Sequence, residues 1–269
     1  MGAPTSPRLG NAPLVCSLDA SGEIDPSVEE LERHLSSGDH RTLRLSPGRW
    51  RRQHPAIDGA AELPADPVRA ILRTVETGGH DIVVVRHSAA WPPRWIRRLI
   101  HESPCSILVQ RTRPPAVVDV LAAVGLGDDA ADHSRHIVEQ AAAIADRLGG
   151  DTHLIHGWDQ YDALATRGTA TFTPAEETAD VAASAEADRR RALDAFAAGV
   201  DHVDAGHAHL AHGPVAEVVE AAVDRHPYAM VVVGASSRTG IEGRLRVSTP
   251  VDILGLVQCS VLVVKPPTP

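Results

Sequence analysis

The sequence predicts an α/β protein in which helices pack on a mostly parallel sheet. Two short β-branched apolar runs, at residues 230–233 and 261–264, enclose a glycine-rich turn and one helical segment. A short apolar run between turn residues is typical of a strand covered on both faces, so this stretch is predicted to be a βαβ unit. Hydrophobic residues make up 43% of the chain but aromatic residues only 3%. This composition favours helices on a parallel sheet over an aromatic-rich β-sandwich.

The first part of the chain alternates predicted strands with predicted helices. Helices are expected to begin at the pairs Asp25-Pro26 and Asp66-Pro67, because aspartate is a favourable cap and proline suits the first helical position. Residues 1–12 are expected to be disordered and residues 46–63 to form a loop. Strands are predicted at residues 14–18, 42–45, 82–85 and 107–109, and helices at residues 25–38, 66–78 and 91–100.

The polar, proline-rich stretch at residues 111–115 predicts a domain boundary. It divides the chain into a shortened first domain, residues 1–113, and a second domain, residues 114–269. The same alternation then returns. Strands are predicted at residues 117–124, 154–155, 202–207, 230–233 and 261–264, and helices at residues 134–148, 175–198 and 214–225.

Three pairs of similar segments occur in the same order in the two parts. P-V-R-A-I-L at Pro67 matches P-V-A-E-V-V at Pro214, and C-S-I-L-V at Cys105 matches C-S-V-L-V at Cys259. Between them, V-E-T-G-G-H-D-I-V-V-V matches V-D-R-H-P-Y-A-M-V-V-V. We therefore expect a tandem duplication of one α/β unit. The two cysteines fall at equivalent positions, where buried and inert thiols are expected.

Charge and composition exclude several classes of partner. A net charge of −9 argues against a nucleic-acid-binding or acidic-membrane surface. No segment has the length of a membrane span, and the proline-rich start lacks the apolar core of a signal peptide. The three cysteines have no paired spacing that would indicate disulfides or a thiolate metal site. The expectation is a cytoplasmic protein with no nucleic-acid or membrane partner.

The loop that follows residues 230–233 is rich in glycine. Gly234, Gly240 and Gly243 lie where open α/β sheets bind ligands, because absent side chains let backbone N–H groups approach a phosphate. Two interpretations remain open. The glycines either bind phosphate or only turn the chain.

Two segments of the second part resemble a known family. V-V-V-G-A-S-S-R-T-G-I, followed by a short helix and C-S-V-L-V-V-K-P, resembles the C-terminal signature of the universal stress protein family. The duplication, together with G-G-H-D-I-V-V-V and G-x-x-x-R-T-G-I, is similar to the tandem members that resemble universal stress protein E. The resemblance implies two tandem adenine nucleotide alpha hydrolase-like domains, each a mostly parallel five-stranded sheet flanked by helices. Their terminal strands would pair across a pseudo-twofold axis, forming an intramolecular pseudo-dimer; further association into a homodimer stays open.

Some members of this family bind ATP through G-x2-G-x9-G-S/T and an acidic residue that ends the first strand. Gly234 and Ser248 match the first glycine and the final hydroxyl, but Ser237 and Val247 replace the other glycines, and Gly125 stands at the acidic position. Side chains there obstruct close backbone approach to phosphate. We expect no ATP site in the first part and a weak or absent one in the second. The residues available to a nucleotide or phosphorylated metabolite are Gly125, Gly234, Arg238, Gly240, Gly243, Ser248 and Thr249.

Four histidines lie within eleven residues, at the strand-to-helix junction expected to face the ligand side. They are His202, His207, His209 and His212. In extended chain His207 and His209 would share a face, which permits chelation of zinc or a similar ion. Solvated loop histidines are the alternative, and both interpretations stay open.

No catalytic residues are predicted, since no serine lies in a G-x-S-x-G motif. The expected function is a non-enzymatic stress-response or regulatory module. The alternatives are a sensor of a nucleotide or phosphorylated metabolite at the Gly234 loop, and a metal-binding module at the histidine cluster.

Overall fold

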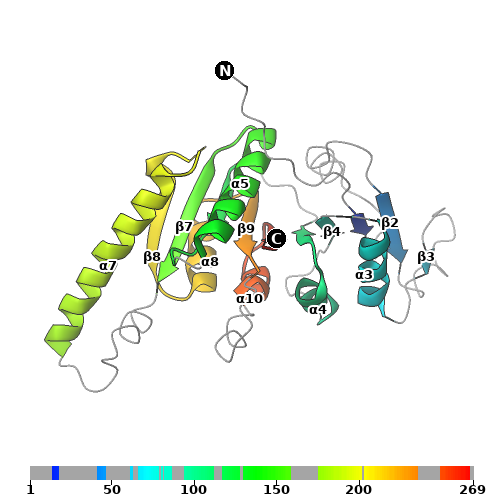
Figure 1. Ribbon diagram of the computed structural model, residues 1–269, viewed down its shortest axis with the longest axis horizontal. Coiled ribbons are helices and arrows are strands. Elements are labelled where there is room, and N and C mark those ends of the chain that lie inside the picture. The colour runs from blue at the N-terminus through cyan, green and yellow to red at the C-terminus, as the bar shows by residue number, and fades with distance from the viewer. Residues whose placement is uncertain are drawn as a thin grey trace.

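The computed structural model describes residues 14–17, 41–46, 61–62, 66–78, 80, 82–86, 94–111, 117–127, 130–158, 175–201, 203–235 and 249–266. Ten strands in these ranges form one sheet in the order β3-β2-β1-β4-β5-β10-β9-β6-β7-β8. The strands are β1 (Leu14–Ser17), β2 (Arg41–Ser46), β3 (Ala61–Glu62), β4 (Ile82–Arg86), β5 (Ser106–Gln110), β6 (Val120–Ala123), β7 (Thr152–Trp158), β8 (Ala208–His212), β9 (Met230–Gly234) and β10 (Ser260–Val264). The α/β fold with a mostly parallel sheet is confirmed (Figure 1).

The pairing of β5 with β10 is antiparallel, whereas the other recorded strand pairs are parallel. Outward from this pair, β4, β1, β2 and β3 follow on one side, and β9, β6, β7 and β8 follow on the other. The expected pairing of the two terminal strands is therefore present. It joins all ten strands into one continuous sheet in place of two separate five-stranded ones, because pairing satisfies the exposed backbone edges of both strands.

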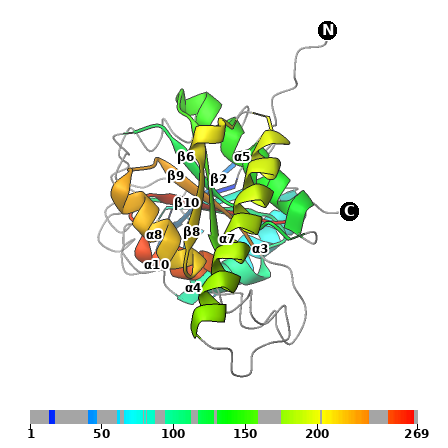
Figure 2. The same ribbon diagram turned by 90° about the vertical axis from the view of Figure 1, so that its left-hand side faces the viewer.

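Helices cover both faces of the sheet. They are α3 (Pro67–Gly78), α4 (Arg94–Glu102), α5 (Ala131–Leu148), α7 (Ala175–Ala198), α8 (Val215–Arg225) and α10 (Thr249–Leu256), with a 3₁₀ turn η2 at Ala205–His207. Buried residues of α3, α4, α8 and α10 share one core cluster, and those of α5 and α7 share another. Figure 2 shows α7 and α8 on opposite sides of β8.

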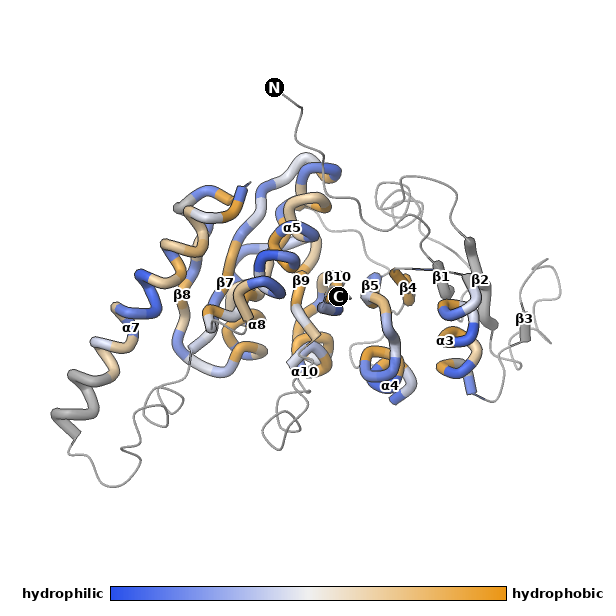
Figure 3. The backbone as a smooth tube through the Cα atoms, viewed as in Figure 1, coloured by the Kyte–Doolittle hydropathy of each residue, from blue (hydrophilic) through white to orange (hydrophobic). Residues whose placement is uncertain are grey.

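Side chains that alternate along the strands contribute to both core clusters. In β9, Val231 and Val233 belong to the first cluster, while Met230 and Val232 belong to the second. This is the period of two expected for a strand covered on both faces. Figure 3 shows the resulting concentration of hydrophobic residues in the central strands, with hydrophilic residues recurring along the helices.

The signals for helix ends agree with the structure. Helix α3 begins after Asp66, whose Oδ1 accepts a hydrogen bond from the Arg69 backbone N–H at 3.2 Å. Helix α5 ends at Gly149, whose φ of 74° lies in the left-handed region that favours glycine. The predicted helix at residues 25–38 and the predicted disorder of residues 1–12 lie outside the described ranges. Within those ranges, no helix combines the length and apolar composition needed to cross a membrane.

Two element predictions were wrong. The strand expected at residues 202–207 is instead the turn η2 and strand β8, where Ala208 pairs with Leu154 and His209 with Ile155. Register follows the apolar residues, and Ala208 and Leu210 pack against the core whereas Asp204 is exposed. In addition, the segment expected to be only loop contains the short edge strand β3.

Candidate functional site

The carboxyl ends of β6 and β9 bring together two of the predicted binding residues. These strands are parallel neighbours, so Gly125, just beyond β6, and Gly234, the last residue of β9, lie at the same edge of the sheet. Thr249 is the first residue of α10. The remaining predicted residues, Arg238, Gly240, Gly243 and Ser248, lie outside the described ranges.

Ser134, in the first turns of α5, engages the backbone of Gly125. The Gly125 N–H donates to Ser134 Oγ at 3.0 Å, and the Ser134 hydroxyl donates to the Gly125 carbonyl at 2.7 Å. The turn after β6 is thus tied to helix α5 through both backbone groups of Gly125. A Cβ at this position would lie 3.2 Å from Ala130 Cβ, which is a tight contact.

Gly234 is in close contact with side chains of helix α5. A Cβ at this position would lie 2.7 Å from Ile137 Cδ1 and 2.9 Å from His133 Cε1. The His133 Nε2–H donates to the Val264 carbonyl at 3.2 Å, which fixes the ring beside the glycine. Burial lowers the pKa of His133. Packing of α5 on the end of β9 therefore accounts for the small residue at position 234.

His156 on β7 is a buried imidazole near this edge. Its Nδ1–H donates to the Val124 carbonyl at 2.8 Å, and its Nε2 has no hydrogen-bond partner among the residues that the structure describes. Burial is the main cause that lowers its pKa, and the nearby charge of Arg189 adds to the effect. The unpartnered ring nitrogen is therefore an unprotonated one.

The predicted histidine cluster divides between the two ends of β8. His207 and His209 lie at its amino end, on the edge opposite the Gly125 and Gly234 turns, so the expectation that they face the ligand side was wrong. His212 lies at the carboxyl end, where its ring meets Trp158 edge-on at a centroid distance of 4.9 Å. The histidines divide in this way because the strand spans Ala208–His212 and not the predicted residues 202–207. His202 lies outside the described residues.

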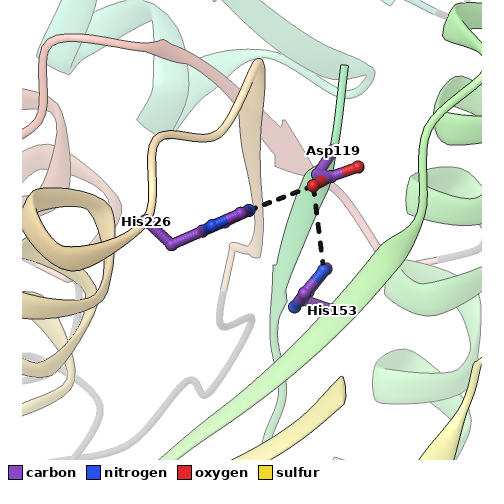
Figure 4. A group of neighbouring side chains, drawn as sticks. All are labelled: Asp119, His153 and His226. Carbon is purple, nitrogen blue, oxygen red and sulfur yellow. Dashed lines mark hydrogen bonds and ion pairs between the residues drawn. The ribbon is translucent and has the colours of Figure 1, made fainter. Parts of the chain in front are cut away.

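Sequence reasoning missed a group at the amino edge of the sheet, formed by Asp119, His153 and His226. Figure 4 shows both imidazoles directed at the Asp119 carboxylate. Asp119 Oδ2 lies 3.0 Å from His226 Nε2 and 4.0 Å from His153 Nε2. Asp119 immediately precedes β6, His153 is the second residue of β7, and His226 follows α8.

Further aromatic rings surround His153. His153 Nδ1 lies 3.3 Å from His209 Nε2, and the His207 ring stacks on His153 with a centroid distance of 4.1 Å. Tyr228 meets His153 edge-on. Burial lowers the pKa of His153 to about 4, with His207 and His209 adding to the effect, so the ring is neutral at pH 7.

The Asp119 carboxylate is ionised at neutral pH. A hydrogen bond from the Asp151 backbone N–H is the largest cause that lowers its pKa, followed by the bond from His226. Its side chain is 21% exposed, compared with 12% for His153 and 47% for His226. The arrangement joins one carboxylate and two imidazoles in a group that solvent can reach.

No local spacing could have revealed this group. Its members are separated by tens of residues in the sequence, and none stands in a motif. The available signal was positional: Asp119 lies near the start of one predicted strand, and His153 and His226 precede two others, while parallel neighbouring strands bring their amino ends together.

Comparisons with known proteins agree with this fold. The structure is similar to a protein of unknown function from Pseudomonas aeruginosa PAO1, with TM-score 0.70 and 18% identity, covering 94% of this chain and 92% of that one. A provisionally assigned universal stress protein from Pseudomonas aeruginosa UCBPP-PA14 gives TM-score 0.69 and 20% identity, covering 95% and 93%. A universal stress protein from Archaeoglobus fulgidus DSM 4304 gives TM-score 0.58 and 14% identity, covering 95% and 96%. These likenesses concern the fold.

Among curated proteins, no sequence matches the chain. The model of the universal stress protein family, however, matches residues 122–265, which is more than half of the 269 residues. The matched region contains β7 to β10, helix α5, Gly125 and Gly234. The chain therefore belongs to the universal stress protein family.

Proposed function

We propose that the chain is a tandem universal stress protein, a non-enzymatic stress-response or regulatory module with domains at residues 1–113 and 114–269. The observation that carries the tandem arrangement is a set of reciprocal hydrogen bonds across the β5–β10 pair. The Arg111 side chain donates to the Leu254 carbonyl at 2.6 Å, and the Lys265 ammonium donates to the Ile100 carbonyl at 2.5 Å.

The alignment of C-S-I-L-V at Cys105 with C-S-V-L-V at Cys259 makes these two bonds equivalent. It pairs Arg111 with Lys265, and Ile100 with Leu254. The backbone bonds repeat the relation: Arg111 N–H donates to Ser260 Oγ, and Lys265 N–H donates to Ser106 Oγ, both at 3.2 Å.

The strand register has the same symmetry. Leu108 lies opposite its equivalent Leu262, with Ile107 opposite Val263 and Val109 opposite Val261. An interface in which residue i contacts j and the equivalent of j contacts the equivalent of i is what a twofold axis produces. This supports docking of two related units through their last strands.

The nucleotide site of the second domain is proposed to be degenerate. Helix α5 packs closely on Gly234, because an added Cβ there would come within 2.9 Å of both His133 and Ile137. At the position where some relatives carry an acidic residue stands Gly125, whose N–H is already bonded to Ser134. These contacts support a regulatory module that does not depend on ATP.

Titration calorimetry of the full chain with Mg·ATP tests this proposal. We expect no saturable binding with a Kd below about 1 mM and no ATP hydrolysis. The matched variant restores the motif by Gly125→Asp, Ser237→Gly and Val247→Gly, and is expected to gain affinity. Micromolar ATP binding by the unmodified chain would contradict the degenerate site.

A sensor of another phosphorylated metabolite is the second candidate. It is favoured by the position of Gly125 and Gly234 on neighbouring strands at the carboxyl edge, where open α/β sheets bind ligands. Repeating the titration with AMP and inorganic phosphate distinguishes this candidate. Saturable binding of either one without ATP binding would favour it.

A further inference from the structure

We propose that Asp119, His153 and His226 form a binding site for a divalent transition-metal ion of the zinc class. The site lies at the amino edge of the sheet, opposite Gly125 and Gly234, so it is independent of the nucleotide question. It also differs from the ligand set that the sequence predicts, because His212 is at the other end of β8.

The distances fit a single ion. One ligand atom from each residue lies within 4.8 Å of the other two. Asp119 Oδ2 is 3.0 Å from His226 Nε2 and 4.0 Å from His153 Nε2. Metal–ligand bonds of about 2.0–2.2 Å in tetrahedral geometry separate the ligand atoms by roughly 3.3 Å. The observed separations lie on either side of that value.

Hydrogen bonds outside the group orient two of the three ligands. His153 Nδ1 lies 3.3 Å from His209 Nε2, and in the tautomer in which Nδ1–H donates, the lone pair of His153 Nε2 is directed towards Asp119. The Asp119 Oδ1 accepts from the Asp151 N–H at 3.0 Å, which leaves Oδ2 for the metal. Metal-binding histidines characteristically donate their other ring N–H in this way, which fixes the tautomer and the ring plane.

The backbone around the group is fixed by regular structure. The Val120 N–H donates to the Asp151 carbonyl at 2.9 Å, and the Ala229 N–H donates to the Asp119 carbonyl at 2.8 Å. The His226 N–H continues helix α8 by donating to Ala222. The ligands are therefore held by two neighbouring strands and a helix end, and the partly exposed His226 gives the ion a path from solvent.

The ligand chemistry selects the class of ion. Two imidazoles and one carboxylate suit zinc and similar transition metals, whereas calcium and magnesium prefer oxygen ligands throughout. Three protein ligands leave one position of a tetrahedral ion for water or another group. The same three side chains could instead form only an ion pair, and the experiment must separate these outcomes.

The experiment uses the full chain, stripped with chelator and titrated with zinc in a competition assay. We expect one zinc per chain with micromolar or tighter affinity, and a higher melting temperature in the presence of zinc. Asp119→Asn, His153→Gln and His226→Gln should each weaken binding by about ten-fold or more. His209→Ala, which removes an orienting partner of His153, should weaken it by about 10–100-fold.

His212→Gln is the matched control, because His212 lies on β8 like His209 but at the opposite edge of the sheet. We expect its zinc affinity to be unchanged. Circular dichroism checks that each variant is folded, and the melting temperature of the unmodified chain tests the site even if a variant is not. Absence of stoichiometric zinc binding, or full affinity in both Asp119→Asn and His153→Gln, would overturn the proposal and leave an ion pair only.

Discussion

Gly234 lies where the end of β9 meets the first turns of α5, and its lack of a side chain has a packing cause. Ile137 and His133 approach so closely that an added Cβ would come within 2.9 Å of both. At the same scale, His156 illustrates a buried base: one ring nitrogen is bonded to Val124, and the other has no partner among the described residues. A stability measurement on a variant tests the role of each of these two residues.

Gly234→Ala should lower the free energy of unfolding by about 1–3 kcal/mol, because the added methyl group overpacks the junction with α5. Urea unfolding measures the difference. Gly127→Ala is the control, since a Cβ there meets nothing within 4 Å, and it should change stability by no more than about 0.5 kcal/mol. Equal effects of the two variants would contradict the packing argument.

The second residue-scale prediction is that stability falls as the pH drops below about 6.5. The pKa of His156 is lowered in the folded protein, so the unfolded chain takes up a proton first. The unfolded state then binds more protons, and stability decreases towards acid with a slope of up to about 1.4 kcal/mol per pH unit for each such group. The contribution of the neutral His156 ring to stability is fully present above about pH 6.5. It is lost progressively as the pH falls from there to the pKa of His156 in the folded protein.

Urea unfolding at several pH values, with chelator present, measures this slope. His156→Gln should reduce it, because glutamine can still donate to the Val124 carbonyl but does not titrate. His133 also has a lowered pKa and a slope of the same sign, so part of the dependence should remain. An unchanged slope in His156→Gln would show that burial of this imidazole has no effect on the pH dependence.

At the scale of elements, cap and turn residues together with hydrophobic periodicity explain which helices and strands the sequence could predict. The alanine-rich segment 175–198 was predicted as a helix with the bounds that α7 has, and the β-branched run at residues 230–233 became β9. Strand β8 was placed several residues too early, because its register depends on pairing with β7. His153 was not recognised as part of a strand for a related reason. Only the apolar pair at residues 154–155 indicated β7, although the strand begins at Thr152.

Gly149→Ala tests the C-terminal stop of helix α5. A side chain at φ 74° is strained, so we expect a loss of about 1 kcal/mol in the free energy of unfolding. Gly199→Ala, just after helix α7, is the comparison. No left-handed φ is recorded there, and an added Cβ would make ordinary contacts of 3.4 and 3.5 Å. A similar loss in both variants would show that the backbone conformation is not the cause.

At the scale of the whole molecule, the two halves of the sheet depend on the β5–β10 pair. Leu108 and Leu262 lie directly opposite each other there, and each is 1% exposed. The amino edge of the same sheet gathers Asp119, His153 and His226 from distant parts of the chain. The repeated segments and the resemblance to the universal stress protein family predicted this pairing of β5 with β10, which is called the seam below. They could not predict the histidine group, because only the sheet order brings its members together.

Leu108→Ala and Leu262→Ala should each lower the free energy of unfolding by about 2–5 kcal/mol, the usual cost of a cavity in a packed core. Because the two side chains share one position at the seam, the double variant should depart from additivity by about 0.5–3 kcal/mol. The control cycle combines Leu108→Ala with Leu154→Ala. Leu154 is equally buried but lies on β7, four strands away, roughly 19 Å at the usual strand spacing.

Additivity is expected for that distant pair, within about 0.5 kcal/mol. Both cycles are measured by urea unfolding, with a single transition as the condition for comparing free energies. If the seam joins the halves into one cooperative unit, the single variants shift the whole transition. Two separate transitions, or additive effects at Leu108 and Leu262, would mean that the halves unfold independently despite the hydrogen bonds between β5 and β10.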